Sequence, residues 1–211
     1  MIKKISLPVI AAAAVLGLTG VAGAAGTTGV ASAPRPAASS PADNLNPGPY
    51  HRALNPLVGT WKAVKTNYLL GTGGKPVVSR DITVKVNWIS KTGGRFLQEK
   101  TDGTLAGKRY YRLGILGFST IDRRYEWTTF DSVTPTAMTY RGAPVTAVTS
   151  VLSIPGEFTD PGVLGPDYLG KTIPMRTVVT LSGKPTFDLY FTPPGQPERL
   201  VDRVVYTRRL K

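Results

Sequence analysis

The sequence contains no cysteine and a single histidine, His51, among its 211 residues. Disulfide bonds are therefore excluded, together with the disulfide frameworks that stabilise many small exported proteins. Metal sites built on cysteine thiolates are excluded as well, and one imidazole offers little for zinc, copper or haem. We predict no metal site and no cofactor, and we expect the fold to depend on its apolar core alone.

Acidic residues are also scarce, since 13 Asp and Glu stand against 26 Lys and Arg and give a formal net charge of +13. A basic chain can attract nucleic acid or anionic lipid. Here the cations are dispersed singly or in pairs such as Arg123-Arg124, without a basic block. We therefore predict a soluble basic surface and no nucleic-acid partner.

The longest uncharged apolar stretch lies at the N-terminus. Lys3 and Lys4 precede residues 5–21, and small residues follow that offer cleavage after Ala24 or after Ala33. This three-part organisation predicts a cleaved signal peptide, which we assign to residues 1–24. A retained anchor is disfavoured because the stretch is short for a bilayer and contains Gly and Pro. We expect a periplasmic or secreted protein with no stable membrane anchor after cleavage.

Residues 25–49 are rich in Ala, Pro, Ser and Gly and have few large apolar side chains. Such a composition predicts a flexible linker, because it cannot bury enough surface to offset the entropy of ordering. The folded domain is predicted to span residues 50–211.

This domain shows no long helical period. Gly and Pro divide it into short runs with strand-like alternation, as where Ile82, Val84 and Val86 share one face. Short connections favour antiparallel neighbours, and closing the sheet removes its exposed edges. We predict an all-β fold, an antiparallel up-and-down lipocalin-like barrel of about ten strands, with residues 155–171 as a loop across one mouth. The predicted strands are residues 57–70, 77–88, 95–102, 108–118, 124–131, 136–140, 145–154, 173–181, 186–192 and 199–209.

Two motifs open and close the domain, Gly59-Thr60-Trp61 and Tyr206-Thr207-Arg208. A Gly-x-Trp sequence after a short turn resembles the start of the calycin superfamily, which includes lipocalins and fatty-acid-binding proteins. The resemblance implies that Trp61 closes one end of the barrel with the Arg208 cation over its ring. Such a contact is worth about 0.5–2 kcal/mol.

A narrower resemblance is carried by a series of short motifs, at residues 93–98, 114–118, 127–132, 156–161, 176–178 and 206–208. Their order and spacing resemble the bacterial domain-of-unknown-function family 1579 over residues 51–209. The resemblance implies a lipocalin-like barrel. It implies no activity, because the family has no assigned chemistry.

Aromatic and arginine side chains are the best candidates for a ligand site. Ligand cavities are mostly apolar with a few polar groups, and an arginine could anchor an anion. The predicted ligand-binding residues are Trp88, Arg95, Trp127, Asp131, Arg176 and Tyr190. Each aromatic could instead pack in the core, because side chains alone fill a narrow barrel.

No catalytic residue is predicted. The serines lack a nucleophile motif and a histidine to activate them. His51 precedes the first strand without an orienting partner, which favours a turn or capping role over ligation. Strand carboxylates such as Glu99, Asp131 and Asp202 are expected to pair with the abundant arginines, and Asp131 could join Arg95 and Arg176 in a buried network.

Three functions stay open. The leading hypothesis is an exported binding protein for a small apolar or amphipathic, anionic ligand, with a cavity of a few hundred cubic ångströms. The second is an enzyme on the same barrel, such as an isomerase, cyclase or hydrolase that uses an interior carboxylate. The third is a structural or interaction module whose barrel is filled.

Overall fold

The computed structural model describes residues 43–210, apart from the side chains of Asp43 and Arg208. The predicted signal peptide and residues 25–42 of the predicted linker lie outside that part of the chain. Contacts with the barrel begin before the predicted start of the domain, because the carbonyl oxygen of Asn44 accepts a 2.7 Å hydrogen bond from the Thr120 hydroxyl. Within residues 43–210, no helix is long and apolar enough to cross a membrane.

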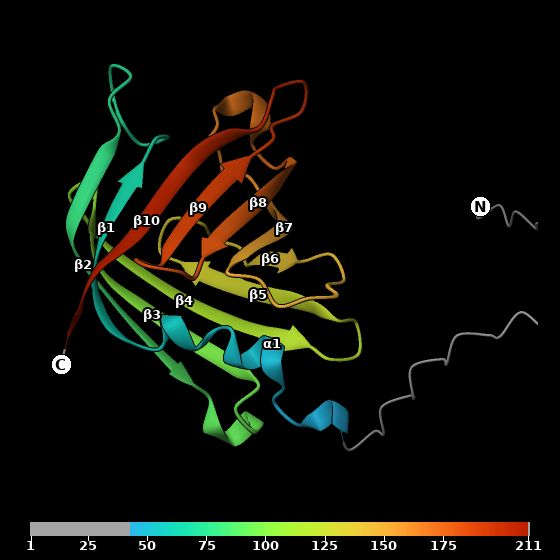
Figure 1. Ribbon diagram of the computed structural model, residues 1–211. Coiled ribbons are helices and arrows are strands. Elements are labelled where there is room, and N and C mark those ends of the chain that lie inside the picture. Colours follow the sequence, from blue (N-terminus) through green and yellow to red (C-terminus); the bar gives the residue numbers. More distant parts are fainter. Residues whose placement is uncertain (1–42, 211) are drawn as a thin grey trace, which may run out of the picture. The chain divides into compact units, whose positions relative to one another are not determined.

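Ten antiparallel strands form one sheet that closes into a barrel, and each strand pairs with its neighbours in the sequence (Figure 1). The first and last strands also pair with each other, from Thr60 opposite Leu210 to Asn67 opposite Asp202. The predicted all-β, up-and-down barrel is therefore confirmed. The strands are β1 (Gly59–Asn67), β2 (Val77–Trp88), β3 (Phe96–Leu105), β4 (Lys108–Ser119), β5 (Arg124–Asp131), β6 (Met138–Arg141), β7 (Val151–Thr159), β8 (Thr172–Thr180), β9 (Thr186–Phe191) and β10 (Arg199–Leu210).

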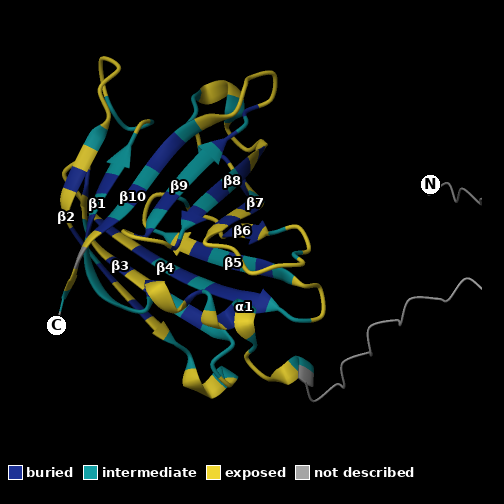
Figure 2. Cartoon of the chain, in the orientation of Figure 1, coloured by how far each residue is buried: buried dark blue, intermediate teal, exposed yellow. Residues whose placement is uncertain are grey.

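The strands follow the alternation of their sequences. On β2, Ile82, Val84 and Val86 are buried inside the barrel, as predicted, and the residues between them are half-buried or exposed. On β9, Phe187 and Phe191 are buried in the same way. Figure 2 shows buried residues along the strands and exposed residues in the loops at both ends. This arrangement follows from the two-residue repeat of a strand, which turns alternate side chains to opposite faces.

Several strand boundaries differ from the sequence prediction, most of all at β7, which was expected at residues 145–154. β7 covers Val151–Thr159 and continues through Pro155 and Gly156, where a loop was expected to begin. Gly156 allows a close approach to β6, because a Cβ there would lie 2.3 Å from the Thr139 carbonyl oxygen. The absence of a side chain at Gly156 therefore allows β7 to pair with β6 beyond Pro155. The sequence had suggested that the strand ends at this proline.

The N-terminal segment closes one end of the barrel. It contains α1 (Pro49–Arg52), which Figure 1 shows beside β4, and the 3-10 turn η2 (Asn55–Leu57). Leu54 and Leu57 of this segment are fully buried. His51 is also buried, and its Nδ1 accepts a 3.0 Å hydrogen bond from the Gly48 amide. The imidazole therefore has the expected capping role. The remaining 3-10 turns of the described chain are η1 (Asp43–Leu45), η3 (Ser90–Thr92) and η4 (Pro166–Tyr168).

The other end carries the loop of residues 160–171, which follows β7 and includes η4. Asp160 organises this loop, since its buried carboxylate accepts hydrogen bonds from the amides of Gly162, Val163 and Leu164 at 2.8–3.2 Å. Val163 lines the cavity inside this end of the barrel. The loop predicted to cross a mouth is thus at the mouth, although it begins at residue 160.

Candidate functional site

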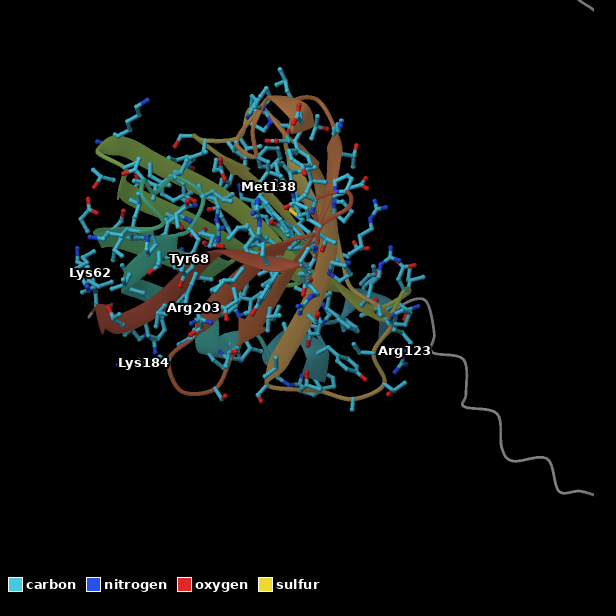
Figure 3. The ribbon with its side chains drawn as sticks, turned by 90° about the horizontal axis from the view of Figure 1, so that it is seen from above. Lys62, Tyr68, Arg123, Met138, Lys184 and Arg203 are labelled. Carbon is cyan, nitrogen blue, oxygen red and sulfur yellow. The ribbon has the colours of Figure 1, made fainter. Side chains whose placement is uncertain are left out.

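A cavity of about 60 Å³ occupies the open half of the barrel. Apolar residues at the strand ends form its outer wall, among them Leu70, Leu105 and Val133. Met138 also lines it and lies among the strands in Figure 3, whereas Lys62 and Lys184 lie at the edge of the molecule. A water molecule needs about 10–15 Å³ by this measure, so the cavity holds several waters and is smaller than the few hundred cubic ångströms expected.

A wider hollow lies directly outside the cavity. It has a volume of about 320 Å³ and shares Leu70, Leu105, Tyr110 and Val133 with the inner cavity. These four side chains border both spaces, and we call them the neck.

Two buried ion pairs contribute to the cavity wall, one with both of its members and the other with its arginine. The first joins Lys65 of β1 to Asp202 of β10, with Lys65 Nζ bonded to Asp202 Oδ2. Lys65 Nζ also lies 5.0 Å from the centre of the Tyr110 ring. Burial lowers the pKa of Lys65, but the Asp202 carboxylate outweighs it and leaves the pKa above its usual value. Lys65 is therefore a cation inside the barrel.

The second ion pair joins Arg112 of β4 to Glu99 of β3. Arg112 Nη2 donates to both carboxylate oxygens of Glu99, at 2.9 and 3.3 Å, and the guanidinium lies 5.0 Å from the Trp127 ring centre. The Thr101 hydroxyl donates to Glu99 Oε1 at 3.0 Å. The pKa of Arg112 is raised well above its usual value, because the Glu99 carboxylate outweighs the effect of burial. The expected pairing of strand carboxylates with arginine is confirmed for Glu99.

Each ion pair leaves one polar atom without a hydrogen-bond partner in the described chain. These atoms are Asp202 Oδ1 and Arg112 Nε, and both side chains line the cavity. The Arg112 and Asp202 residues are only 8% and 7% exposed. A buried polar group without a partner costs about 1–3 kcal/mol. Four other buried side-chain atoms among residues 43–210 also have no partner, but their residues do not line the cavity: His51, Trp127, Thr129 and Tyr206.

Two tyrosines complete the polar wall. Burial raises the pKa of Tyr140 to about 12. Burial also raises the pKa of Tyr110, against the opposing effect of the Lys65 and Arg112 cations. Both phenols are therefore neutral near pH 7, so they are poor general bases.

Asp131 is the one predicted site residue that lines this cavity. Its Oδ1 accepts hydrogen bonds from the amides of Val133 and Thr134, at 2.9 and 2.7 Å, so the carboxylate fixes the turn after β5. Trp127 lies deeper in the barrel, 2% exposed, against the rings of Tyr140 and Phe187 at 5.1 and 5.7 Å. Trp127 therefore packs in the core, which was the alternative to ligand binding for each aromatic residue.

The other four predicted ligand residues do not line the cavity. Trp88 donates from Nε1 to Asn55 Oδ1 at 3.0 Å, and Arg95 donates from Nε to the Thr92 carbonyl at 2.8 Å. Both lie near the N-terminal segment that closes the barrel. On the outer face, Arg176 pairs with Glu198 and lies 4.6 Å from the Tyr190 ring centre. The structure therefore does not bring the six predicted residues together.

The closed end has the kind of contact that the calycin resemblance implied. The Arg209 guanidinium lies 5.7 Å from the Trp61 ring centre, and Trp61 Nε1 donates to the Leu57 carbonyl at 2.9 Å. Gly59 makes room for Arg209, because a Cβ there would lie 2.6 Å from the arginine Nε. The side chain predicted for this role, that of Arg208, lies outside the described side chains.

Sequence reasoning missed Lys65 and Arg112 as cavity residues. Both occupy inward positions of their strands. Ala63 lies two residues before Lys65 and Tyr110 two residues before Arg112, and all four residues are buried. Strand alternation could have identified them, since each charge stands in register with apolar neighbours two residues away. Within residues 43–210, no group of three or more His, Asp or Glu side chains is placed to hold a metal ion.

Glycines in the residue 114–118 motif have a packing role. A Cβ on Gly114 would lie 2.7 Å from Trp127 Nε1, and a Cβ on Gly117 would lie 2.3 Å from the Phe96 ring. These positions let large aromatic side chains pack flat on the sheet.

No curated protein matches the chain. The family model described as "Protein of unknown function (DUF1579)" matches residues 46–208, so the chain belongs to that family.

Proposed function

We propose that this protein binds a small amphipathic molecule in the open end of its barrel and acts outside the cytoplasm. The observation that carries the proposal is the cavity itself, which has an apolar neck and a polar inner end where Asp202 Oδ1 and Arg112 Nε have no partner among residues 43–210. A barrel interior that served stability alone would not need two charged pairs beside the cavity, because apolar side chains of similar volume stabilise a core as well or better.

The geometry favours a ligand whose polar group enters first. The unpartnered atoms lie on Arg112 and Asp202, whereas Leu70, Leu105 and Val133 belong to the neck, which borders the wider hollow. An apolar tail would contact the neck and cover its side chains. The anionic ligand expected from the sequence is not part of this proposal, because Arg95 and Arg176 do not line the cavity and Arg112 is already paired.

The test is to close the neck from the loop side. Val133 is 38% exposed and borders both spaces, so Val133→Trp places a large ring at the entrance with little cost to the core. Val148 is 49% exposed, lies outside both spaces, and gives Val148→Trp as a matched control. A neutral fluorescent probe, N-phenyl-1-naphthylamine, should bind the wild type and the control and bind at least about tenfold more weakly to the neck variant. Equal binding by all three proteins would contradict the proposal.

A filled structural module is the second candidate, and the small inner volume of about 60 Å³ favours it. The same titration separates the two functions. A protein that binds neither the probe nor any small amphipathic compound, in any of the three forms, belongs to the structural class. The enzyme hypothesis has less support, because the interior carboxylates Glu99 and Asp202 are both paired with cations.

A further inference from the structure

The charges around the inner cavity limit the ligand group that can bind there. Lys65 and Asp202 cancel, as do Arg112 and Glu99, and both pairs are buried. Asp131 adds one further carboxylate to the cavity wall. An anionic group would therefore meet no unpaired cation and at least one carboxylate, and it would lose its hydration on entry.

The two unpartnered atoms have opposite requirements. Asp202 Oδ1 is an acceptor and needs a donor, whereas Arg112 Nε carries a hydrogen and needs an acceptor. A carboxylate can satisfy Arg112 but has no hydrogen for Asp202. An ammonium group can satisfy Asp202 but has no acceptor for Arg112. A primary amide or a protonated carboxylic acid has both a donor and an acceptor on one small group.

We propose that the ligand of this cavity carries an uncharged polar group that is both donor and acceptor, of the carboxamide or carboxylic acid type, on an apolar tail. The donor faces Asp202 Oδ1 and the acceptor faces Arg112 Nε. This inference rests on the proposed function and specifies its ligand class. Since a site built around a hydrogen-bonding group rejects analogues that leave its buried atoms unpaired, the selectivity is expected to be large.

The first experiment compares three ligands with the same tail. Decanamide, decanoate and decylammonium displace N-phenyl-1-naphthylamine from the wild-type protein at pH 8, where the acid is ionised and the amine is charged. Decanamide should bind at least about tenfold more tightly than either ion. Equal or tighter binding of decanoate or decylammonium would overturn the proposal.

The second experiment uses pH and no variant. Lowering the pH from 8 to 6 raises the protonated fraction of decanoic acid up to about tenfold per unit, because its carboxyl titrates near pH 4–5 like a glutamic acid side chain. The apparent affinity for the acid should therefore rise by at least about tenfold over this range. Decanamide, which does not titrate, is the control for any change in the protein. A constant affinity for the acid would contradict the proposal.

The third experiment changes the cavity charge. Asp202→Asn removes the carboxylate and leaves the Lys65 cation without its partner. The preference should then shift toward decanoate by at least about tenfold. Glu198→Gln makes the same change in net charge on the outer face, where Glu198 pairs with Arg176, and should leave the preference unaltered. Circular dichroism confirms that each variant is folded, and the pH experiment decides the matter should Asp202→Asn not fold.

The outcomes separate the two proposals. A wild-type protein that binds neither the probe nor any of the three ligands lacks the binding function, and both proposals fail. A protein that binds them without preference, or with an unchanged preference after Asp202→Asn, retains the binding function but not the ligand class inferred from Arg112 and Asp202.

Discussion

Breaking the Arg112–Glu99 pair should destabilise the barrel strongly. Both residues are less than a tenth exposed, and Arg112 donates two hydrogen bonds to the Glu99 carboxylate at 2.9 and 3.3 Å. Removing one member of a buried ion pair leaves an uncompensated charge and costs about 3–5 kcal/mol. We therefore expect Arg112→Met and Glu99→Gln each to lower the free energy of unfolding by about that amount. The Arg112→Met variant also loses the contact with the Trp127 ring.

The double variant should cost far less than the sum of the single variants. With both charges gone, no uncompensated ion is left inside, and the coupling energy should be at least about 2 kcal/mol. Urea unfolding at pH 7.5, followed by tryptophan fluorescence, measures all four free energies. The matched control is Arg176→Met with Glu198→Gln, whose side chains are 32% and 38% exposed, and whose coupling should be about 0–1 kcal/mol. Additive losses at Arg112 and Glu99 would refute the argument that this pair is a buried unit.

Three further predictions concern the closed end and the N-terminus. Gly59→Ala should destabilise the fold by about 1–3 kcal/mol in urea unfolding, because φ at Gly59 is +138° and a Cβ would displace Arg209 from above Trp61. Burial lowers the pKa of His51 below its unfolded value of about 6.5, so the unfolded protein binds more protons than the folded protein as the pH falls below that value. The free energy of unfolding should therefore decrease as the pH drops through about 6.5. Urea titrations at pH 5–8 measure this slope, and His51→Asn should remove it. Mass spectrometry of the exported protein should find its N-terminus between residues 25 and 34, and an intact Met1 would contradict cleavage.

The barrel could be predicted because its signals are local. Alternation on β2 placed Ile82, Val84 and Val86 inside from the sequence alone, and Gly and Pro marked most strand ends. The Gly-x-Trp motif could be identified in the same way, because Gly59 and Trp61 act within one strand. Such features depend on neighbours a few residues apart, which a single sequence contains.

The inward direction of Lys65 and Arg112 could have been read from alternation, but the pairing of the cavity residues could not be predicted, because it depends on register between distant strands. Lys65 meets Asp202 only because β1 pairs with β10, and that pairing shifts register between Lys62 and Ala63. The same pairing places Arg209 opposite Trp61, one residue beyond the arginine that the resemblance implied. Bulges of this kind move charged side chains by one position and leave little trace in the sequence.

The position of the two ion pairs is the strongest reason to look for a ligand. Replacing a buried pair by apolar residues of similar volume is often neutral or stabilises a protein by about 1–4 kcal/mol, so stability alone does not explain Lys65–Asp202 and Arg112–Glu99. Toward the closed end the interior is built mainly from apolar side chains such as Leu54, with His51 as a buried polar exception, whereas Lys65, Asp202 and Arg112 line the cavity. This polar layer beside the cavity, with one donor and one acceptor without a partner among residues 43–210, is the feature on which the proposed binding function rests.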